Sequence, residues 1–148
     1  MSLLDNIDKD LAQALKGGDR KKVTVLRGLK SDLKYKRIDK GDELTDADAI
    51  DVLSSAAKQR RDSIEQYRAG NRDDLADQEQ YELELIQGYL PEQLDEEKLR
   101  QIVANVIAEV GAESPADLGK VMKAVMPKVK GQADGKQVNK IAAEILSK

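Results

Sequence analysis

The chain contains no cysteine and no histidine, and its 148 residues include no tryptophan and no phenylalanine. Without cysteine it forms no disulfide and offers no thiol nucleophile, and without histidine it lacks the commonest general base and zinc ligand. Its serines therefore have no imidazole partner, and no glycine-rich phosphate or dinucleotide motif is present. We nominate no catalytic residue, metal ligand or cofactor, and we do not expect a free-standing enzyme.

Long hydrophobic runs are also missing. The first residues, Met1–Asn6, lack the basic and apolar segments of a secretory signal. Nowhere does an apolar run approach the ~20 residues that a membrane-spanning helix needs. From these absences we expect a cytoplasmic protein that does not insert into a membrane.

The residues that are present favour helices. Aromatic residues make up 3% of the chain and charged residues 36%, so a core must be built from leucine, isoleucine, valine, alanine and methionine. β-Sheets draw on aromatic and β-branched side chains, and no useful strand-like alternation is found. The sequence therefore predicts an all-α fold.

Four helices are predicted before Pro91, with approximate ranges 2–17, 20–40, 45–69 and 71–90. Gly18 and Gly41 suit helix ends, because glycine readily takes the left-handed conformation. Thr45 with Asp48 forms the spacing of a capping box, and Asn71 with Asp74 repeats it. The apolar face of the second helix includes Val23, Leu26, Leu29, Leu33 and Ile38.

Pro91 is the best candidate for a domain boundary, because proline cannot continue a helix interior. We predict an N-terminal helical domain over 1–91 and a C-terminal three-helix bundle over 92–148. In the bundle, the first helix begins after Asp95, and the second begins after Ser114 and ends at Pro127. The third helix lies near the end of the chain. Met122 and Met126 are expected to pack in its core.

Charge is strongly segregated along the chain. Residues 20–40 hold nine cations and two aspartates, a balance of +7, whereas residues 41–100 hold seventeen acids and seven bases, a balance of −10. The basic helix could neutralise RNA phosphates. Alternatively, its cations form a solvated face or pair with the acidic fourth helix. The candidate RNA-binding residues here are Arg20, Lys21, Lys22, Arg27, Lys30 and Lys34.

A glycine-containing loop before the last helix is the second candidate site. Glycines allow a ligand close to the backbone, and a helix N-terminus attracts anions, so a phosphate could bind between flanking lysines. The alternative is a tight turn in which Asp134 caps the helix. The candidate residues are Lys120, Lys128, Lys130, Gly131, Gln132, Gly135 and Lys136.

Two further charged groups favour ordinary surface roles. The acids Asp73, Asp74, Asp77, Glu79, Glu82 and Glu84 have no histidine partner and no calcium-loop pattern, so solvation explains them better than a metal. A smaller cationic group could contact RNA, or its members are exposed cations of a helix: Lys58, Arg60, Arg61 and Arg68.

Three segments resemble the GatB/YqeY family: Tyr89–Leu94, Leu118–Met122 and above all Gly131–Asn139. The resemblance extends over essentially the whole chain and is closest to stand-alone YqeY-like proteins. It implies a small bacterial protein with an N-terminal helical domain and a C-terminal three-helix domain. The same unit forms the tail of the B subunit of glutamine-dependent tRNA amidotransferase, a carbon–nitrogen ligase with glutamine as amide donor, where it is understood to contact tRNA.

The resemblance implies a non-catalytic module that binds tRNA or associates with tRNA-dependent amidation, because the domains that carry the ligase chemistry are missing from this sequence. The runner-up is a protein-interaction module that docks on an amidotransferase or another enzyme without binding RNA. The two interpretations differ in whether the basic helix and the 128–136 loop present their cations for a common ligand.

Overall fold

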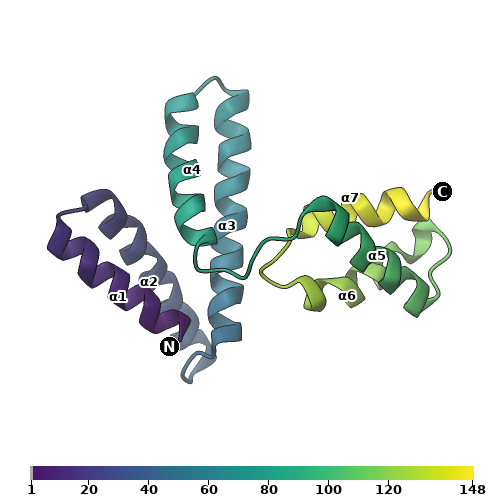
Figure 1. The fold of residues 1–148 in the computed structure, drawn as a ribbon, viewed down its shortest axis with the longest axis horizontal. Helices are drawn as coiled ribbons and strands as arrows, with labels where there is room; N and C mark the ends of the chain where they lie inside the picture. Colours follow the sequence, from purple (N-terminus) through teal and green to yellow (C-terminus); the bar gives the residue numbers. More distant parts are fainter. Residues whose placement is uncertain (1) are drawn as a thin grey trace. The chain divides into compact units, whose positions relative to one another are not determined.

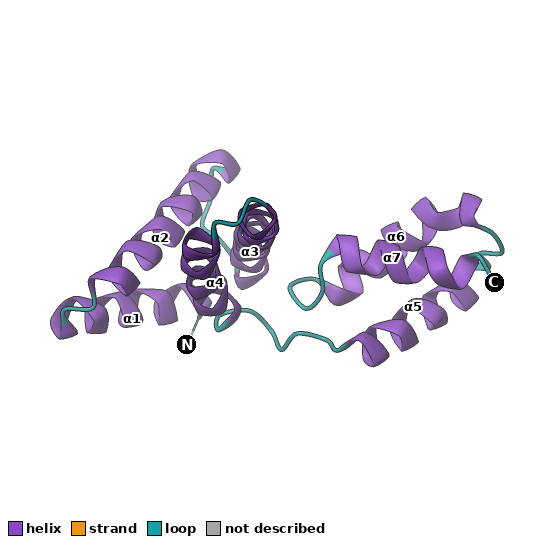
Figure 2. Cartoon of the chain, turned by 90° about the horizontal axis from the view of Figure 1, so that it is seen from above, coloured by secondary structure: helices purple, strands orange, loops and turns teal. Residues whose placement is uncertain are grey.

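A computed structural model describes residues 2–148, and all its regular elements in that range are helical. The prediction of an all-α fold is confirmed. The chain divides into two compact units, Met1–Leu90 and Pro91–Lys148 (Figures 1 and 2). Each unit has its own apolar core, and each is described separately below.

Unit 1 consists of two helical hairpins. The first pairs α1 (Leu3–Gly17) with α2 (Arg20–Lys40), and the second pairs α3 (Asp46–Ala69) with α4 (Asp73–Gln87) (Figure 1). The turn between α1 and α2 is closed by Gly18, which caps α1 with φ at 71°. Only glycine takes this left-handed conformation at no steric cost, which is why the Gly17–Gly18 pair predicts the turn.

The core of unit 1 compensates for the scarcity of aromatic residues with small side chains. Ala49, Ala56 and Ala57 of α3 and Ala76 of α4 are buried, and such small side chains let α3 approach its neighbouring helices closely. Leucines and isoleucines fill the remaining space. The fully buried ones are Ile7, Leu26, Leu29, Leu53 and Ile86.

Two predictions at the ends of α2 and α4 are wrong. Ile38 does not join the apolar face of α2: it is 66% exposed, because the buried stripe of α2 ends at Leu33. Asn71 does not cap α4, because it takes a left-handed conformation with φ at 59°, and Arg72 precedes the helix without a side-chain cap bond.

Helix α4 ends at Gln87 rather than continuing to Pro91, yet the segment after it still belongs to unit 1. Tyr89 and Leu90 pack against the core, and the Tyr89 hydroxyl donates a hydrogen bond of 2.5 Å to the Asp10 carboxylate of α1. Burial, followed by this bond to a carboxylate, raises the pKa of Tyr89 well above its ordinary value. The hydroxyl therefore stays protonated and remains a donor.

Unit 2 is a three-helix bundle of α5 (Glu96–Val110), α6 (Leu118–Val125) and α7 (Gly135–Leu146) (Figure 2). Fully buried valines dominate its core: Val103, Val106, Val121, Val125, Val129 and Val138. Helix α6 is shorter than predicted, because its ends are 3₁₀ turns over Pro115–Asp117 and Met126–Val129. Pro127 lies inside the second turn, which carries Val129 into the core.

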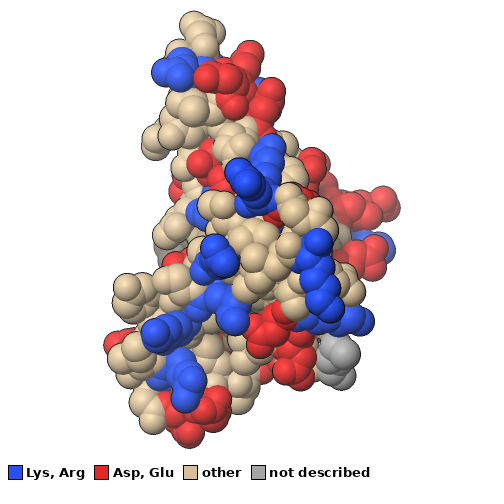
Figure 3. Space-filling model, turned by 90° about the vertical axis from the view of Figure 1, so that its left-hand side faces the viewer, with Lys and Arg blue, Asp and Glu red and all other residues tan. Residues whose placement is uncertain are grey.

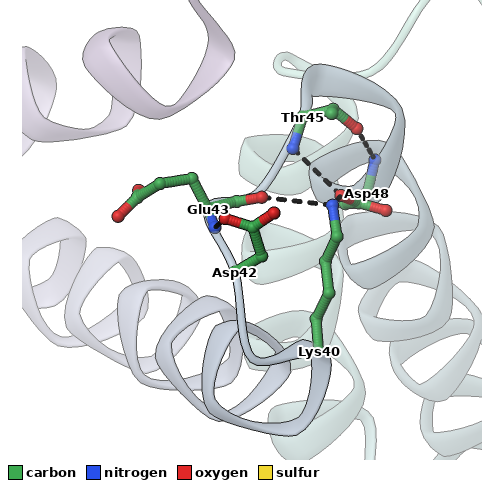
Figure 4. Close-up of polar contacts among 5 residues, drawn as sticks. All are labelled: Lys40, Asp42, Glu43, Thr45 and Asp48. Atoms are coloured by element: carbon green, nitrogen blue, oxygen red, sulfur yellow. Dashed lines mark hydrogen bonds and ion pairs between the residues drawn. The ribbon is translucent and has the colours of Figure 1, made fainter.

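The junction between α2 and α3 is held by a polar network around Asp48 (Figure 4). The Lys40 ammonium group donates to the Glu43 carbonyl at 3.1 Å and to the Asp48 carboxylate at 2.5 Å. Thr45 and Asp48 form the predicted capping box, in which each side chain accepts a hydrogen bond from the other residue's backbone amide. The hydrogen bond from Lys40, and then that from the Thr45 amide, lowers the pKa of Asp48 to about 2.

This network predicts an acid-sensitive part of the stability. Since the pKa of Asp48 is lower in the folded state than its ordinary 3.8, its contribution is complete above that value and is lost as pH falls toward 2. We expect Asp48→Asn to lower the free energy of unfolding at pH 6 and to reduce its dependence on pH below 4. Urea unfolding across this range measures both effects. Lys40→Met is the companion variant, and an unchanged pH dependence in both would contradict the assignment.

Candidate nucleic-acid interface

Three of the predicted cations line up along the outer side of α2. Arg20, Arg27 and Lys34 are spaced by seven residues, close to the two turns of an α-helix, about 7.2 residues, and all three are exposed. They lie on a different face of the helix from the one that buries Leu26, Leu29 and Leu33. We call these three residues the α2 basic stripe. Figure 3 shows the side of unit 1 on which α1 and α2 lie, where basic and acidic side chains are interspersed.

Other predicted cations of α2 have partners within unit 1. The Lys21 ammonium nitrogen lies 4.1 Å from the centre of the Tyr81 ring of α4, a cation–π contact that ties α2 to α4. Lys30 forms an ion pair of 2.7 Å with Asp8 of α1. Lys22 is half-buried near the start of the helix. These three residues are therefore less available to a ligand than the α2 basic stripe.

The acidic helix α4 forms its ion pairs with α3. Arg60 lies 3.6 Å from Glu79 and 3.5 Å from Glu82, with all three side chains about four-fifths buried. Arg68 pairs with Asp73 and Asp77 at 3.5 and 3.3 Å. Burial, and then the neighbouring Glu82, raises the pKa of Glu79 more than Arg60 lowers it. Arg60 is thus a packed structural cation, and α4 does not neutralise the α2 basic stripe through these pairs.

The 128–136 loop of unit 2 is organised around the backbone of residues 92–94. The Leu94 amide donates to the Gln132 carbonyl at 2.9 Å, and the Gln93 side chain donates to the Gly131 carbonyl at 2.7 Å. The Gln132 side chain in turn donates to the Glu92 carbonyl at 3.3 Å. Gly131 is buried with φ at 77°, a conformation that favours glycine. Gly131 and Gln132 therefore have a structural role, which is to fasten the segment that follows Pro91.

The start of α7 is capped as the alternative interpretation of the loop expects. The Asp134 carboxylate accepts a hydrogen bond from the Lys136 amide. A Cβ added at Gly135 would lie 3.7 Å from the Met126 side chain, which is an ordinary van der Waals contact. Lys128 pairs with Glu109 at 3.1 Å. Lys120, Lys130 and Lys136 are exposed. The lysines of this candidate site are thus exposed, whereas Gly131, Gln132 and Gly135 have structural roles in the loop and at the start of α7.

Sequence reasoning missed one prominent surface feature of α2. Tyr35 is 71% exposed and lies between Lys34 and Lys36, and Ile38 follows it by nearly one turn. The sequence did contain a signal for its exposure, because Tyr35 falls outside the helical stripe of buried residues Val23, Leu26, Leu29 and Leu33. On the helix surface, however, its neighbours three and four residues away include Asp32, Ile38 and Asp39, because adjacent residues of a helix do not face each other.

Among residues 2–148, no group of carboxylates is arranged to hold a metal ion. In the same part of the chain, no helix is both long enough and apolar enough to span a membrane. The candidate groups therefore remain the cations of α2, in unit 1, and those of the 128–136 loop, in unit 2.

Comparison with known proteins gives one family. The model of the family described as "Yqey-like protein" matches residues 4–146. A curated relative from Lachancea thermotolerans, altered inheritance of mitochondria protein 41, is 35% identical over 75% of this chain and 61% of its own length. The protein of the same name from Eremothecium gossypii is 39% identical over 59% of this chain and 48% of its own length.

A third relative of that name, from Pyrenophora tritici-repentis, is 25% identical over 97% of this chain and 81% of its own length. The chain spans about half to three-fifths of the length of the first two relatives. All three are named as mitochondrial proteins of fungi. The expectation of a bacterial, cytoplasmic protein is therefore wrong. The cytoplasmic expectation was drawn from the lack of a secretory signal and of a long apolar run, which does not separate the cytoplasm from mitochondria, and the bacterial expectation was drawn from the family resemblance alone.

Proposed function

Because the chain belongs to the Yqey-like protein family, we propose that it is a non-catalytic tRNA-binding module whose helix α2 contacts the phosphate backbone. The α2 basic stripe carries this proposal. Its three cations are exposed, whereas four other cations of the same helix contact residues of unit 1: Lys21 contacts Tyr81, Lys30 contacts Asp8, Arg37 contacts Glu43 and Lys40 contacts Asp48. A row of exposed cations can neutralise several phosphates of a nucleic acid and release their counterions.

The kind of nucleic acid is proposed from the resemblance of the sequence to the tail of the tRNA amidotransferase B subunit. The overall charge of −3 disfavours indiscriminate binding to nucleic acid, because acidic surfaces outside the stripe repel a polyanion. A polyanionic ligand is therefore attracted only if its phosphates contact α2 and stay away from the acidic helix α4. A folded RNA of defined shape meets that requirement better than a long, uniform duplex.

The lysines of unit 2 supply a secondary contact in this proposal. Lys120, Lys130 and Lys136 are exposed, and Lys128 can exchange its surface partner Glu109 for a phosphate at little cost, since exposed ion pairs contribute only ~0–1 kcal/mol. The role of Gly131 and Gln132 is to hold the loop in shape rather than to touch RNA.

The direct test is a fluorescence-anisotropy titration of bulk tRNA at two salt concentrations, with a DNA duplex of similar size as comparison. We expect tRNA binding that weakens with salt with a slope of about −2 to −4, as for a few phosphate contacts. Duplex DNA should bind more weakly. Equal affinity for both nucleic acids would reject a tRNA module, and no binding at low salt would favour the protein-docking alternative.

A further inference from the structure

Helix α2 has a second uncharged face, and this one is exposed. The buried uncharged residues of the helix are Val23, Val25, Leu26, Leu29 and Leu33, and all its other uncharged residues are exposed. These exposed residues follow one another at intervals of four, three, four and three: Thr24, Gly28, Ser31, Tyr35 and Ile38. Such intervals are the heptad spacing of a helix that packs against another helix. We call these five residues the α2 seam.

The α2 seam contains two large apolar side chains and a glycine that unit 1 does not require. Tyr35 is 71% exposed and Ile38 is 66% exposed. Glycine is less favourable than alanine inside a helix, yet a Cβ added at Gly28 would meet nothing within 4 Å. A second helix packed on the seam would benefit from Gly28 and Ser31, because small side chains at the contact shorten the distance between two helix axes.

The charges beside the α2 seam differ in sign on its two flanks. Arg27 and Lys34 of the α2 basic stripe each precede a seam residue, whereas Asp32 and Asp39 each follow one. The surroundings of these residues agree: both aspartates line the groove between α2 and α3, and Lys34 lines a hollow between α1 and α2. Among residues 2–148, none of the four flanking side chains has an ion-pair partner.

We propose that the α2 seam is the contact surface of a homodimer, in which the α2 helices of two copies pack in parallel across a two-fold axis. In a parallel pair with heptad spacing, a residue on one flank lies opposite the residue five positions later on the second helix. Arg27 then meets Asp32 of the second copy, and Lys34 meets Asp39 of the second copy. The two-fold axis repeats both contacts, so the interface contains four pairs of opposite charge.

This self-complementarity is the argument for a second copy as the occupant. An antiparallel arrangement would bring the two basic flanks together and the two acidic flanks together, so the charges select the parallel one. A helix of one charge sign would be attracted by one flank and repelled by the other. The core of unit 1 already holds α2 in its helical form, so dimerisation does not have to order a helix. With two large apolar side chains per copy, the interface is small and the dimer depends on protein concentration.

The dimer goes beyond the proposed function and does not depend on it, because pairing between two copies needs no RNA. It does use two of the three cations of the α2 basic stripe. Arg27 and Lys34 can meet either the aspartates of a second copy or the phosphates of a nucleic acid. RNA binding and dimerisation would therefore exclude each other at α2.

The test is sedimentation equilibrium of the full chain, without RNA, at about 10 µM to 1 mM, the range that suits a weak complex. Asp32→Lys with Asp39→Lys makes both flanks basic, and Arg27→Glu with Lys34→Glu makes both acidic. We expect the unaltered chain to dimerise, and each double variant to dimerise at least about 20-fold more weakly, because four attractive pairs become repulsive. An equimolar mixture of the two variants should restore the dimer, since every basic flank then meets an acidic one.

Recovery on mixing separates a direct contact from a folding defect, because one misfolded chain would not restore another. Lys9→Glu with Lys16→Glu is the matched control: both lysines are exposed on α1, and their replacement changes the net charge as much as the acidic variant does. This control should dimerise like the unaltered chain. If it loses the dimer equally, long-range charge explains the association and the α2 seam is not the interface.

Thr24→Cys tests the orientation, since the chain has no cysteine of its own. In the parallel dimer the two introduced thiols lie opposite each other, and oxidation should link them. In an antiparallel dimer residue 24 faces residue 38, which leaves the thiols about 20 Å apart, too far for a disulfide. Lys36→Cys is exposed outside the seam and should not be linked.

Three results would overturn the proposal: a chain that stays monomeric at every concentration, double variants that dimerise as well as the unaltered chain, or a mixture that fails to restore the dimer. A monomeric chain would leave the α2 seam to a helix of another protein. None of these results bears on the tRNA titration, so failure of the dimer and failure of the proposed function are distinguishable.

Discussion

Leu53→Ala is expected to lower the free energy of unfolding of unit 1 by about 3 kcal/mol, because it removes a fully buried side chain of α3 from the core. Leu53 belongs to the core that α1, α2, α3 and α4 share, so the cavity would weaken both hairpins. Native-state hydrogen exchange on the intact chain measures the effect. Amides in the buried turns of α2 and α3 should lose about 100-fold in protection, which corresponds to that free energy.

The same experiment tests whether the two units are stabilised independently. Unit 2 has its own core of buried residues, including Val103, Val121 and Val138, so its amides should keep their protection. Leu15→Ala is the matched control, since Leu15 is 51% exposed and its truncation should cost less than ~1 kcal/mol. An equal loss of protection in α5–α7 would contradict separate cores, and no loss in α3 would contradict the burial of Leu53.

The helices were largely predictable because their signals are local. Apolar residues at helical spacing, the Thr45–Asp48 capping box and the left-handed Gly18 and Gly41 fix most boundaries without reference to the rest of the fold. The failures occur where one residue has two favourable conformations. Asparagine caps helices but also tolerates positive φ, and at Asn71 the second property prevails because the Arg72 amide bonds back to the Tyr67 carbonyl.

The candidate interface was predictable only as a set of charges. The sequence identifies α2 as basic, but the partners of Lys21 and Lys30 are Tyr81 and Asp8, which are distant in the chain and adjacent only after folding. Likewise, nothing in the composition says that the acids of α4 pair with Arg60 and Arg68 rather than with α2. The α2 basic stripe emerges when these tertiary pairs are taken into account.

The loop before α7 illustrates how a structural requirement can imitate a binding motif. A glycine pair with flanking lysines suggests anion binding, yet Gly131 adopts a positive φ in a buried turn and Gln132 bonds to the backbone at Glu92. The sequence could not distinguish these roles, because the partner segment lies about 40 residues earlier in the chain. The Gly131–Asn139 segment, which carries the family resemblance, therefore includes residues that build the bundle.

Replacing the α2 basic stripe is expected to have the largest effect on RNA binding. In the variant Arg20→Gln, Arg27→Gln, Lys34→Gln, three phosphate contacts lose their cations, and the affinity for tRNA should fall by about 100-fold at 0.1 M salt. The slope of log affinity against log salt should become shallower by about 2 to 3. Anisotropy titrations over a series of salt concentrations measure both quantities, and circular dichroism should show an unchanged helix content, since all three positions are exposed.

The control must remove the same charge from elsewhere. Lys9, Lys16 and Lys98 are exposed and lie outside both candidate groups, so their replacement by glutamine changes the net charge equally. If both triple variants weaken tRNA binding alike, long-range charge explains the affinity and α2 is not the interface. If the stripe variant loses affinity without a change in slope, its residues act through folding or shape rather than by releasing counterions. A loss of both affinity and slope confined to the stripe variant places the phosphates along α2.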